Sequence, residues 1–240
     1  MYDFKDKVVL ITGATRGLGE ALARTLAEEG AKLELVARDA EAARATALEI
    51  RREFGGEVFS RVCDITDPQK VQSVVEEAFR RYGRLDLVIN NAAILGKMAL
   101  VPDYTPEAWA GVINANLNGA YYVAHHAARK MRTAGGGRIV FVTSSVARNF
   151  RPRWGAYSVS KAGGEALVRL MAEETAETQV VACAINPGAM ATGMRQEAFP
   201  EEDQSTLPSP TTVAQAFLKI LRQADKQLNG RTINARDFLQ

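Results

Sequence analysis

The chain has 240 residues, of which 47% are hydrophobic and 24% are charged, and its formal net charge at pH 7 is +2. Acidic and basic residues are interspersed, so the sequence offers no continuous basic face for nucleic acid, and no apolar run is long enough to cross a membrane. Length and composition are ordinary for one α/β domain with a large core. Because no apolar signal segment precedes the first strand-like run, we expect a cytoplasmic protein.

Seven short apolar runs alternate with helical stretches along the whole chain. The runs occupy residues 8–12, 33–36, 58–62, 85–90, 139–143, 180–185 and 232–234. This alternation predicts an α/β fold, with a doubly wound parallel sheet of about seven strands and helices on both faces. We expect one domain over residues 1–240, with ligand contacts at the carboxyl ends of the strands.

A glycine-rich loop follows the first predicted strand and opens the first predicted helix. It reads Gly13-Ala-Thr-Arg-Gly17-Leu-Gly19. Glycines at such a junction permit a tight turn and let the backbone approach a pyrophosphate, which then meets the positive end of the helix. The spacing is G-x-x-x-G-x-G rather than G-x-G-x-x-G, but its position at the first strand-to-helix junction predicts nucleotide binding.

The second predicted strand ends where the adenosine ribose of a dinucleotide is expected. A carboxylate there would bind both ribose hydroxyls and repel a 2′-phosphate, but Ala37 occupies the position and Arg38 follows it. Arg16 could reach the same phosphate, and each charge-assisted hydrogen bond from arginine contributes roughly 1.5–3 kcal/mol. The pattern favours NADP(H). NAD(H) remains possible if both arginines are ordinary surface charges, and the adjacent Asp39 could partly neutralise Arg38.

Tyr157 and Lys161 are four residues apart in a predicted helix, so their side chains share one face. A nearby ammonium stabilises a phenolate, and lowering a tyrosine pKa from about 10 to about 7 needs roughly 4 kcal/mol of such stabilisation. The pair is therefore a candidate proton donor and acceptor. A solvated helix face would fit the same spacing, but two serines at 144–145 precede it and Asn-Pro-Gly follows at 186–188.

Taken together, these motifs resemble the classical short-chain dehydrogenase/reductase family, and the resemblance covers nearly the whole chain. The matching segments are residues 12–19, 63–64, 90–93, 116–119, 144–145, 157–161 and 186–188 with Thr192. The lead-in at 154–157 and the segment 197–203 are similar to a bacterial branch, the YciK-type oxidoreductases. The resemblance implies a Rossmann fold and an enzyme that acts on CH–OH donors with NAD(P). Its substrate would be a small-molecule carbonyl or alcohol, interconverted by hydride transfer.

The resemblance also implies a catalytic set of four residues. Tyr157 would exchange a proton with the substrate oxygen, and Lys161 would lower the tyrosine pKa and bind the nicotinamide ribose. Ser145 would polarise the carbonyl, and Asn116 would hold a water that links Lys161 to solvent. Ser144 stays open as the alternative, since it precedes Tyr157 by thirteen residues, the usual family spacing, whereas Ser145 precedes it by twelve.

Cofactor contacts follow from the same resemblance, and no metal site is expected. The expected set is Thr12, Gly13, Thr15, Arg16, Gly17, Leu18, Gly19, Arg38, Asp64, Ile65, Asn91, Ala92, Tyr157, Lys161, Pro187, Gly188 and Thr192. Asn90 is expected beside the adenosine ribose and the central sheet. For Asp64 and Asn90, a cap or turn role fits equally well. Ala93 stands where the family usually has glycine, and we expect its methyl group to be accommodated.

Two segments would flank the substrate. The loop before Tyr157 carries Arg148, Arg151 and Arg153, which could clamp an acidic group, although a solvated surface or a subunit contact would also explain them. Residues 189–210 contain three prolines and should form the other wall as a mobile substrate lid, whose acidic residues 201–203 would oppose an acidic ligand.

Cys63 and Cys183 lie in or beside predicted strands, which favours two buried thiols over a disulfide or a metal site. The helical stretches 106–132 and 155–177 would form the usual family dimer face, so we expect a homodimer or homotetramer. Two functions compete with an NADP(H)-dependent oxidoreductase. One is an NAD-preferring alcohol dehydrogenase of the same family, and the other is a non-catalytic regulator that senses NADP(H).

Overall fold

The computed structural model describes residues 2–239, and its sheet contains seven parallel strands in the order β3-β2-β1-β4-β5-β6-β7. The strands are β1 (Val8–Thr12), β2 (Lys32–Ala37), β3 (Val58–Val62), β4 (Leu87–Asn90), β5 (Gly137–Val142), β6 (Val180–Asn186) and β7 (Thr232–Asn234). The predicted doubly wound sheet is therefore confirmed. The predicted strand boundaries are correct to within two residues.

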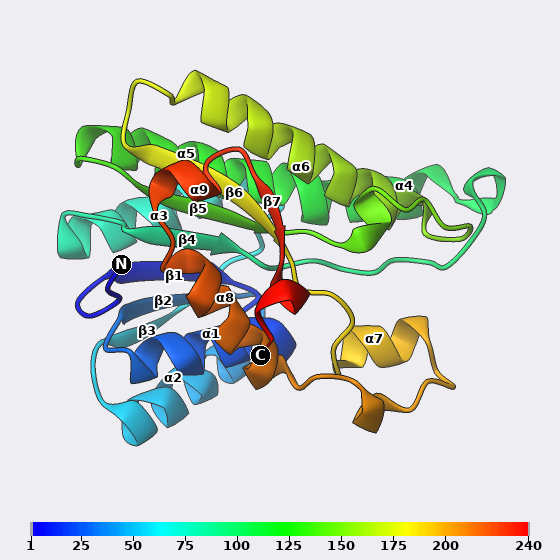
Figure 1. Cartoon of the computed structure of the whole chain (residues 1–240), viewed down its shortest axis with the longest axis horizontal. Helices are drawn as coiled ribbons and strands as arrows, with labels where there is room; N and C mark the ends of the chain where they lie inside the picture. The colour runs from blue at the N-terminus through cyan, green and yellow to red at the C-terminus, as the bar shows by residue number, and fades with distance from the viewer. Residues whose placement is uncertain (1, 240) are drawn as a thin grey trace.

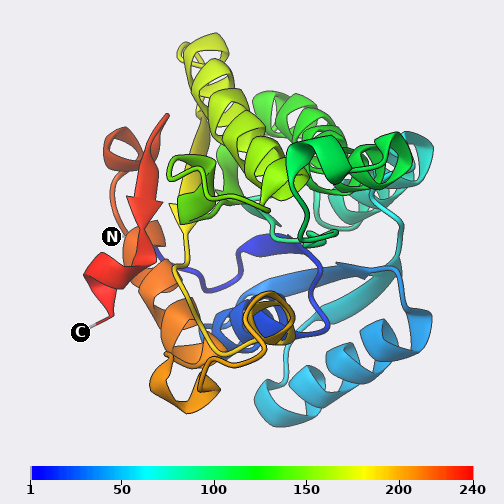
Figure 2. The same ribbon diagram turned by 90° about the vertical axis from the view of Figure 1, so that its right-hand side faces the viewer.

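Helices cover both faces of this sheet (Figure 1). The helices are α1 (Gly17–Glu28), α2 (Ala40–Phe54), α3 (Pro68–Tyr82), α4 (Pro106–Ile113), α5 (Gly119–Thr133), α6 (Gly155–Glu174), α7 (Gly193–Ala198), α8 (Pro210–Leu221) and α9 (Asp225–Leu228). α1 packs against α2 and α8 on one face, and α3 packs against α5 on the other. In Figure 2 the end of the molecule that carries α7 faces the viewer.

Alternation along β1 explains why the protein has a core on each side of the sheet. Val9 and Ile11 contribute to the core beneath α1 and α8, whereas Val8 and Leu10 face α3 and α5. All four are almost fully buried. A strand that is apolar on both faces can lie only in the middle of a covered parallel sheet, which is where β1 is found.

The strand order reverses between β2 and β4, which both pair with β1. Val9 aligns with Leu33 of β2 and with Leu87 of β4. The chain leaves β1 toward one edge of the sheet and later returns to β4 on the other side. At such a switch point the connecting loops diverge and leave a crevice beyond the carboxyl ends of the strands.

One long predicted helix is interrupted. The stretch expected at 106–132 consists of α4, a π-helical segment over Asn114–Asn118 and then α5. A π-helical turn carries an extra residue, and such turns are frequent at functional sites. Its sequence, Asn-Ala-Asn-Leu-Asn, contains no glycine or proline that would mark an interruption, so the sequence pattern did not reveal it. The two cysteines are buried and free, as predicted.

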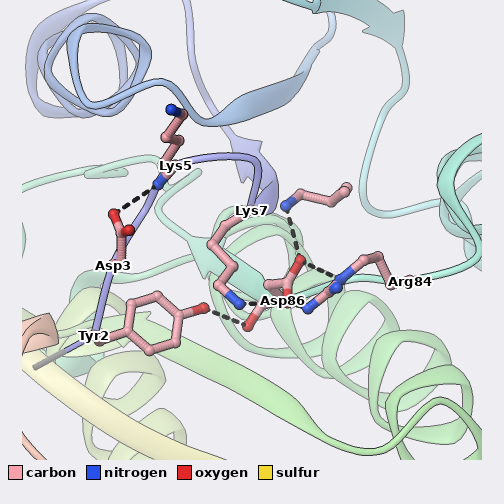
Figure 3. A network of polar contacts seen from close by, with 7 residues as sticks. Tyr2, Asp3, Lys5, Lys7, Arg84 and Asp86 are labelled. Atoms are coloured by element: carbon pink, nitrogen blue, oxygen red, sulfur yellow. Dashed lines mark hydrogen bonds and ion pairs between the residues drawn. The ribbon is translucent and has the colours of Figure 1, made fainter.

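At the amino ends of the strands, opposite the crevice, Asp86 joins the starts of β1 and β4 (Figure 3). Its carboxylate accepts a hydrogen bond of 2.9 Å from the backbone N–H of Val8 and one of 2.8 Å from Nε of Arg84. Lys7 Nζ lies 3.7 Å from the same carboxylate, and Asp86 as a residue is 8% exposed. The buried carboxylate of Asp86 therefore accepts a hydrogen bond from the backbone of β1 and pairs with two cations.

Replacing this acid should cost stability without changing the crevice. Asp86→Ala leaves the buried N–H of Val8 without a partner, so we expect the free energy of unfolding to fall by about 2–3 kcal/mol. Asp3→Ala is the matched control, because Asp3 is exposed and accepts only the N–H of Lys5. Urea unfolding followed by circular dichroism measures both. Equal effects of the two substitutions would contradict the role assigned to Asp86.

Candidate active site

A cleft of about 890 Å³ lies beyond the carboxyl ends of the central strands. The loops after β1, β2, β3, β4 and β6 contribute to its lining, together with residues of α6 and α7. The predicted cofactor residues that line it are Gly13, Thr15, Arg16, Gly17, Leu18, Arg38, Asp64, Ile65, Asn91, Ala92, Tyr157, Lys161, Pro187 and Thr192. Six of the predicted site residues do not line the cleft: Thr12, Gly19, Gly188, Asn116 and the two candidate serines.

The glycine loop is shaped for close backbone approach. Gly13 and Gly17 have φ of +66° and +56°, in the left-handed region that favours glycine. A methyl group on Gly19 would come within 2.1 Å of the carbonyl oxygen of Gly13, so that position excludes any side chain. Arg16 is the N-cap of α1 but makes no side-chain cap bond, which leaves the first N–H groups of the helix free for an anion.

Thr12 and Asn91 hold this loop against the end of β4. The hydroxyl oxygen of Thr12 accepts from the backbone N–H groups of Asn91 and Ala92, both at 3.1 Å. The Asn91 amide donates to the carbonyl oxygens of Thr12 and Gly13, both at 3.0 Å. Thr12 is therefore a buried support of the cleft floor rather than part of its surface, and this explains its place outside the lining.

At the end of β2, Arg38 lines the cleft, as does Arg16 of the glycine loop. Both are exposed, and neither makes an ion pair within residues 2–239. Asp39 does not neutralise Arg38 by contact, because its carboxylate caps α2 and accepts from the N–H groups of Glu41 and Ala42 at 2.9 and 3.0 Å. Two guanidiniums thus face the position expected for the ribose of adenosine.

Asp64 performs the turn role and also lines the cleft. It accepts hydrogen bonds from the backbone N–H and the hydroxyl of Thr66, at 3.0 and 2.8 Å. The backbone bond is the larger reason why the pKa of Asp64 lies below its usual value. Asn90 differs: its side chain is buried, and its amide has no hydrogen-bond partner within residues 2–239.

Tyr157 and Lys161 project from α6 into the cleft, and they are 8% and 7% exposed. Lys161 Nζ donates a 2.7 Å hydrogen bond to the carbonyl oxygen of Val142, the last residue of β5. The same nitrogen lies 5.5 Å from the centroid of the tyrosine ring. The prediction that the two side chains share one face is therefore correct.

Burial dominates the pKa of both groups in this arrangement, and the lowering of the tyrosine pKa expected from Lys161 stays a prediction. Burial raises the pKa of Tyr157 to about 12, and burial lowers the pKa of Lys161 to about 8. Desolvation penalises both charged forms, and the ammonium is directed at a backbone carbonyl rather than at the phenol oxygen. The spacing of the two residues is visible in the sequence, whereas their burial is not.

Asn116 lies in the π-helical segment and clamps the loop after β4. Its amide oxygen accepts from the N–H of Ile94 at 2.8 Å, and its amide nitrogen donates to the carbonyl oxygen of Ile94 at 2.9 Å. The same nitrogen is 3.2 Å from the hydroxyl of Ser160, one residue before Lys161. These bonds link the loop to α6. The water-holding role expected of Asn116 stays a prediction.

The two candidate serines stand at the end of β5 and are half-buried. Ser144 is the N-cap of the 3₁₀ turn Ser145–Ala147, and its hydroxyl accepts from the N–H of Val146 at 3.5 Å. The hydroxyl of Ser145 makes no hydrogen bond within the described part of the chain. The hydroxyl of Ser145 is thus unengaged within these residues, whereas that of Ser144 accepts one long bond and can still donate; the choice of Ser145 stays a prediction.

The structure does not bring the arginines of the loop before Tyr157 into the cleft. Arg148, Arg151 and Arg153 are all exposed, and none of them lines the cleft. Arg148 lies 3.6 Å from the buried Glu165, which accepts a 2.8 Å hydrogen bond from the hydroxyl of Thr143. Solvated surface, the alternative interpretation, fits this loop.

Aromatic contacts around the tyrosine were missed by the sequence reasoning. The rings of Trp154 and Tyr157 are 5.7 Å apart, and those of Trp154 and Phe199 are 5.9 Å apart. Phe199 belongs to the segment 189–210, the expected lid, which contains α7 and a 3₁₀ turn at Gln204–Thr206. The three-residue spacing of Trp154 and Tyr157 was the only available signal, because the contact with Phe199 is made across the fold.

The fold and this cleft define a Rossmann-type, dinucleotide-binding class of protein. The family model for short chain dehydrogenases matches residues 7–203. The chain therefore belongs to the short-chain dehydrogenase family and is an oxidoreductase. No helix within residues 2–239 is long and apolar enough to span a membrane, and the same residues contain no His, Cys, Asp and Glu cluster suited to a metal ion.

Individual relatives agree with this assignment. The chain is 32% identical to the oxidoreductase YciK of Escherichia coli strain K12 over 232 residues, which are 96% of this chain and 92% of that protein. It is 35% identical over 195 residues to versicolorin reductase stcU of Emericella nidulans, covering 80% of this chain and 72% of that protein. The predicted resemblance to YciK-type oxidoreductases is confirmed.

Solved structures give the same result. A short-chain dehydrogenase from Shigella flexneri, in complex with NADP, superposes with a TM-score of 0.91 at 30% identity and covers 98% of this chain and 100% of that chain. One from Escherichia coli CFT073, in complex with NADPH, gives a TM-score of 0.90 at 30% identity and covers 98% of each chain.

The buried ammonium of Lys161 should lower the stability of the fold, although the residue belongs to the predicted catalytic set. Because the pKa of Lys161 falls from its usual 10.5 to about 8 in the fold, the unfolded chain binds more protons between these pH values. The stability penalty is thus complete below pH 8 and relieved as pH rises toward 10.5. Without cofactor, we expect Lys161→Met to raise the free energy of unfolding at pH 7 by about 2 kcal/mol. This gain is smaller than the pKa shift of Lys161 alone implies, because the variant also loses the hydrogen bond to Val142.

Urea unfolding of both proteins at pH 7 and at pH 10 measures this difference. The advantage of the variant should shrink at pH 10. A Lys161→Met protein that is less stable than the parent at pH 7 would mean that the hydrogen bond to Val142 outweighs the desolvation of the ammonium.

Proposed function

We propose that the protein is an NADP(H)-dependent oxidoreductase that interconverts a carbonyl compound and a secondary alcohol. The observation that carries the proposal is the buried pair Tyr157 and Lys161, which opens into the same cleft as the glycine loop. The residues present fit the cofactor, because the glycines exclude side chains from the loop and the N–H groups at the start of α1 are free for a pyrophosphate.

Two arginines of the cleft support NADP(H) over NAD(H). Arg16 and Arg38 would bind the 2′-phosphate, whose two negative charges suit a pair of guanidiniums, and Asp39 is engaged in capping α2. Solved relatives in complex with NADP and with NADPH agree with this preference. Pro187 and Thr192 line the cleft near α7 and would contact the carboxamide of the nicotinamide.

The chain's own residues would bind, orient and protonate the substrate. NADPH would supply the hydride. Tyr157 would donate the proton to the carbonyl oxygen, and its raised pKa keeps the phenol protonated at neutral pH. The hydroxyl of Ser145 would hydrogen-bond the same oxygen and polarise the carbonyl. Lys161 would bind the nicotinamide ribose, for which its ammonium would have to share or exchange the carbonyl oxygen of Val142.

The α5 and α6 surface supports a homodimer or homotetramer as part of the proposal. Tyr121, Val159 and Leu170 are large apolar side chains on these helices, and they are 44%, 45% and 58% exposed. Apolar residues on adjoining helices are typical of subunit contacts. The assembly and the cytoplasmic location remain predictions.

Tyr157→Phe tests the proton donor. We expect kcat for NADPH-dependent reduction to fall by at least about 100-fold, because the phenylalanine ring fills the same space but cannot donate a proton. Tyr122→Phe is the control, since Tyr122 lies on α5 outside the cleft. Aldehydes, ketones, quinones and 3-oxoacyl thioesters would be assayed by NADPH absorbance. Tight NADPH binding with no turnover of any compound would favour the NADP(H)-sensing regulator.

Arg38→Ala tests the choice of cofactor. Loss of one charge-assisted hydrogen bond should raise the Kd for NADPH about 10- to 100-fold and leave the Kd for NADH nearly unchanged. Arg44→Ala, an exposed arginine of α2 outside the cleft, is the matched control. Calorimetric titration of both nucleotides gives the constants. Parent protein that binds NADH more tightly than NADPH would favour the NAD-preferring dehydrogenase.

A further inference from the structure

The part of the cleft beside Tyr157 has an apolar wall. Leu95 and Tyr157 belong to one hydrophobic cluster, against which Ile94 and Met194 pack, and all four residues line the cleft. The other contributors to this cluster include Trp154, which contacts the tyrosine ring edge-on. Methionine adapts to irregular shapes because its side chain is unbranched and flexible. Such a wall suits the apolar body of a substrate.

One carboxylate stands on this wall. α7 presents Gly193, Met194 and Glu197 to the cleft, and residues three apart on a helix share a face, so Glu197 lies beside Met194. Its carboxylate makes no hydrogen bond or ion pair within residues 2–239. The other charged residues of the lining are Lys161, placed in the catalytic set, and Arg16, Arg38, Asp39 and Asp64 of the adenosine end.

Contacts of Arg195 and Phe199 fix α7, whereas the Glu197 side chain is exposed. The guanidinium of Arg195 pairs with Glu202, with a 2.6 Å contact from Nη2, and stacks 3.8 Å from the centroid of the Phe199 ring. Phe199 in turn packs on Trp154. Arg195 is thus committed to Glu202 and does not neutralise Glu197.

No cation of the neighbouring loop, residues 148–153, offsets the charge. The arginines at 148, 151 and 153 are exposed and do not line the cleft, and the first of them faces Glu165. An anionic substrate would therefore bring a second negative charge to this apolar wall. Among the described residues that line the cleft there, Lys161 is the only cation that could balance the charge. Glu197 is exposed, so the repulsion between the two like charges acts partly through solvent and weakens as salt is added.

We infer that the substrate is an uncharged or cationic carbonyl compound with an apolar body, and that Glu197 selects against carboxylates. This inference rests on the proposed function, since it assigns the substrate class of the same site. Glu197 determines specificity and takes no part in the proton or hydride transfer.

The test compares two aldehydes that differ in charge but share one ring, para-carboxybenzaldehyde and para-methylbenzaldehyde, at saturating NADPH. The parent protein should prefer the methyl compound. Glu197→Gln should raise the kcat/KM ratio of the carboxylate to the methyl compound about three- to tenfold, and Glu197→Lys should raise it further. Comparing each ratio with that of the parent cancels the different reactivities of the two aldehydes, and the KM for NADPH should stay constant.

Glu201→Gln is the matched control, because Glu201 is exposed in the same segment but does not line the cleft. A parent protein that prefers the carboxylate, or a ratio that Glu197→Gln leaves unchanged, overturns the inference. If neither aldehyde is reduced, the proposed function is what fails for these compounds. Calorimetry then decides the inference: the Kd values of para-carboxybenzamide and para-methylbenzamide are measured for the NADPH-loaded parent and Glu197→Gln proteins. The inference requires Glu197→Gln to strengthen binding of the carboxylate relative to the methyl compound.

Discussion

The hydrogen bonds between Thr12 and the turn after β4 are the constraint on which the cleft depends. β1 and β4 are neighbours in the sheet, but their loops must separate to admit a ligand. Asn91 donates two hydrogen bonds to Thr12 at this point, and its amide also donates to the carbonyl oxygen of Gly13. The glycine loop is therefore fixed from below, and its upper surface stays available. The packing of Gly13 against Ala92 then requires a residue without a side chain.

The fold could be predicted from the sequence because each strand carries its own signal. β1 is a run of apolar, mainly β-branched residues, and a glycine loop follows it directly. Residues of the site that lie within one element were predicted for the same reason, as the shared face of Tyr157 and Lys161 demonstrates. The interruption at Asn114–Asn118 was not predictable, because a π-helical turn leaves the composition of a helix unchanged.

Residues whose role depends on contacts across the fold were beyond the sequence pattern. The expected lowering of the tyrosine pKa considers the ammonium alone, whereas burial acts on both groups and Val142 determines where the ammonium is directed. The arginines of the loop before Tyr157 suggest an anion clamp, yet they face solvent. Glu197 carries no signal of its own in the sequence, and its place in the cleft lining depends on how α7 lies in the fold.

Charged residues stand at different positions along the cleft, and their positions favour one orientation of a bound ligand. Arg16 and Arg38 mark the end where an adenosine phosphate would lie, while Glu197 marks the wall beside Tyr157. A dinucleotide placed in reverse would bring its phosphorylated ribose toward the carboxylate and away from both guanidiniums. A carbonyl substrate without negative charge meets no such opposition near the tyrosine. The positions of the two guanidiniums, rather than a difference in net charge between the two ends, thus favour one orientation of the cofactor, and Glu197 disfavours a carboxylate at the apolar end.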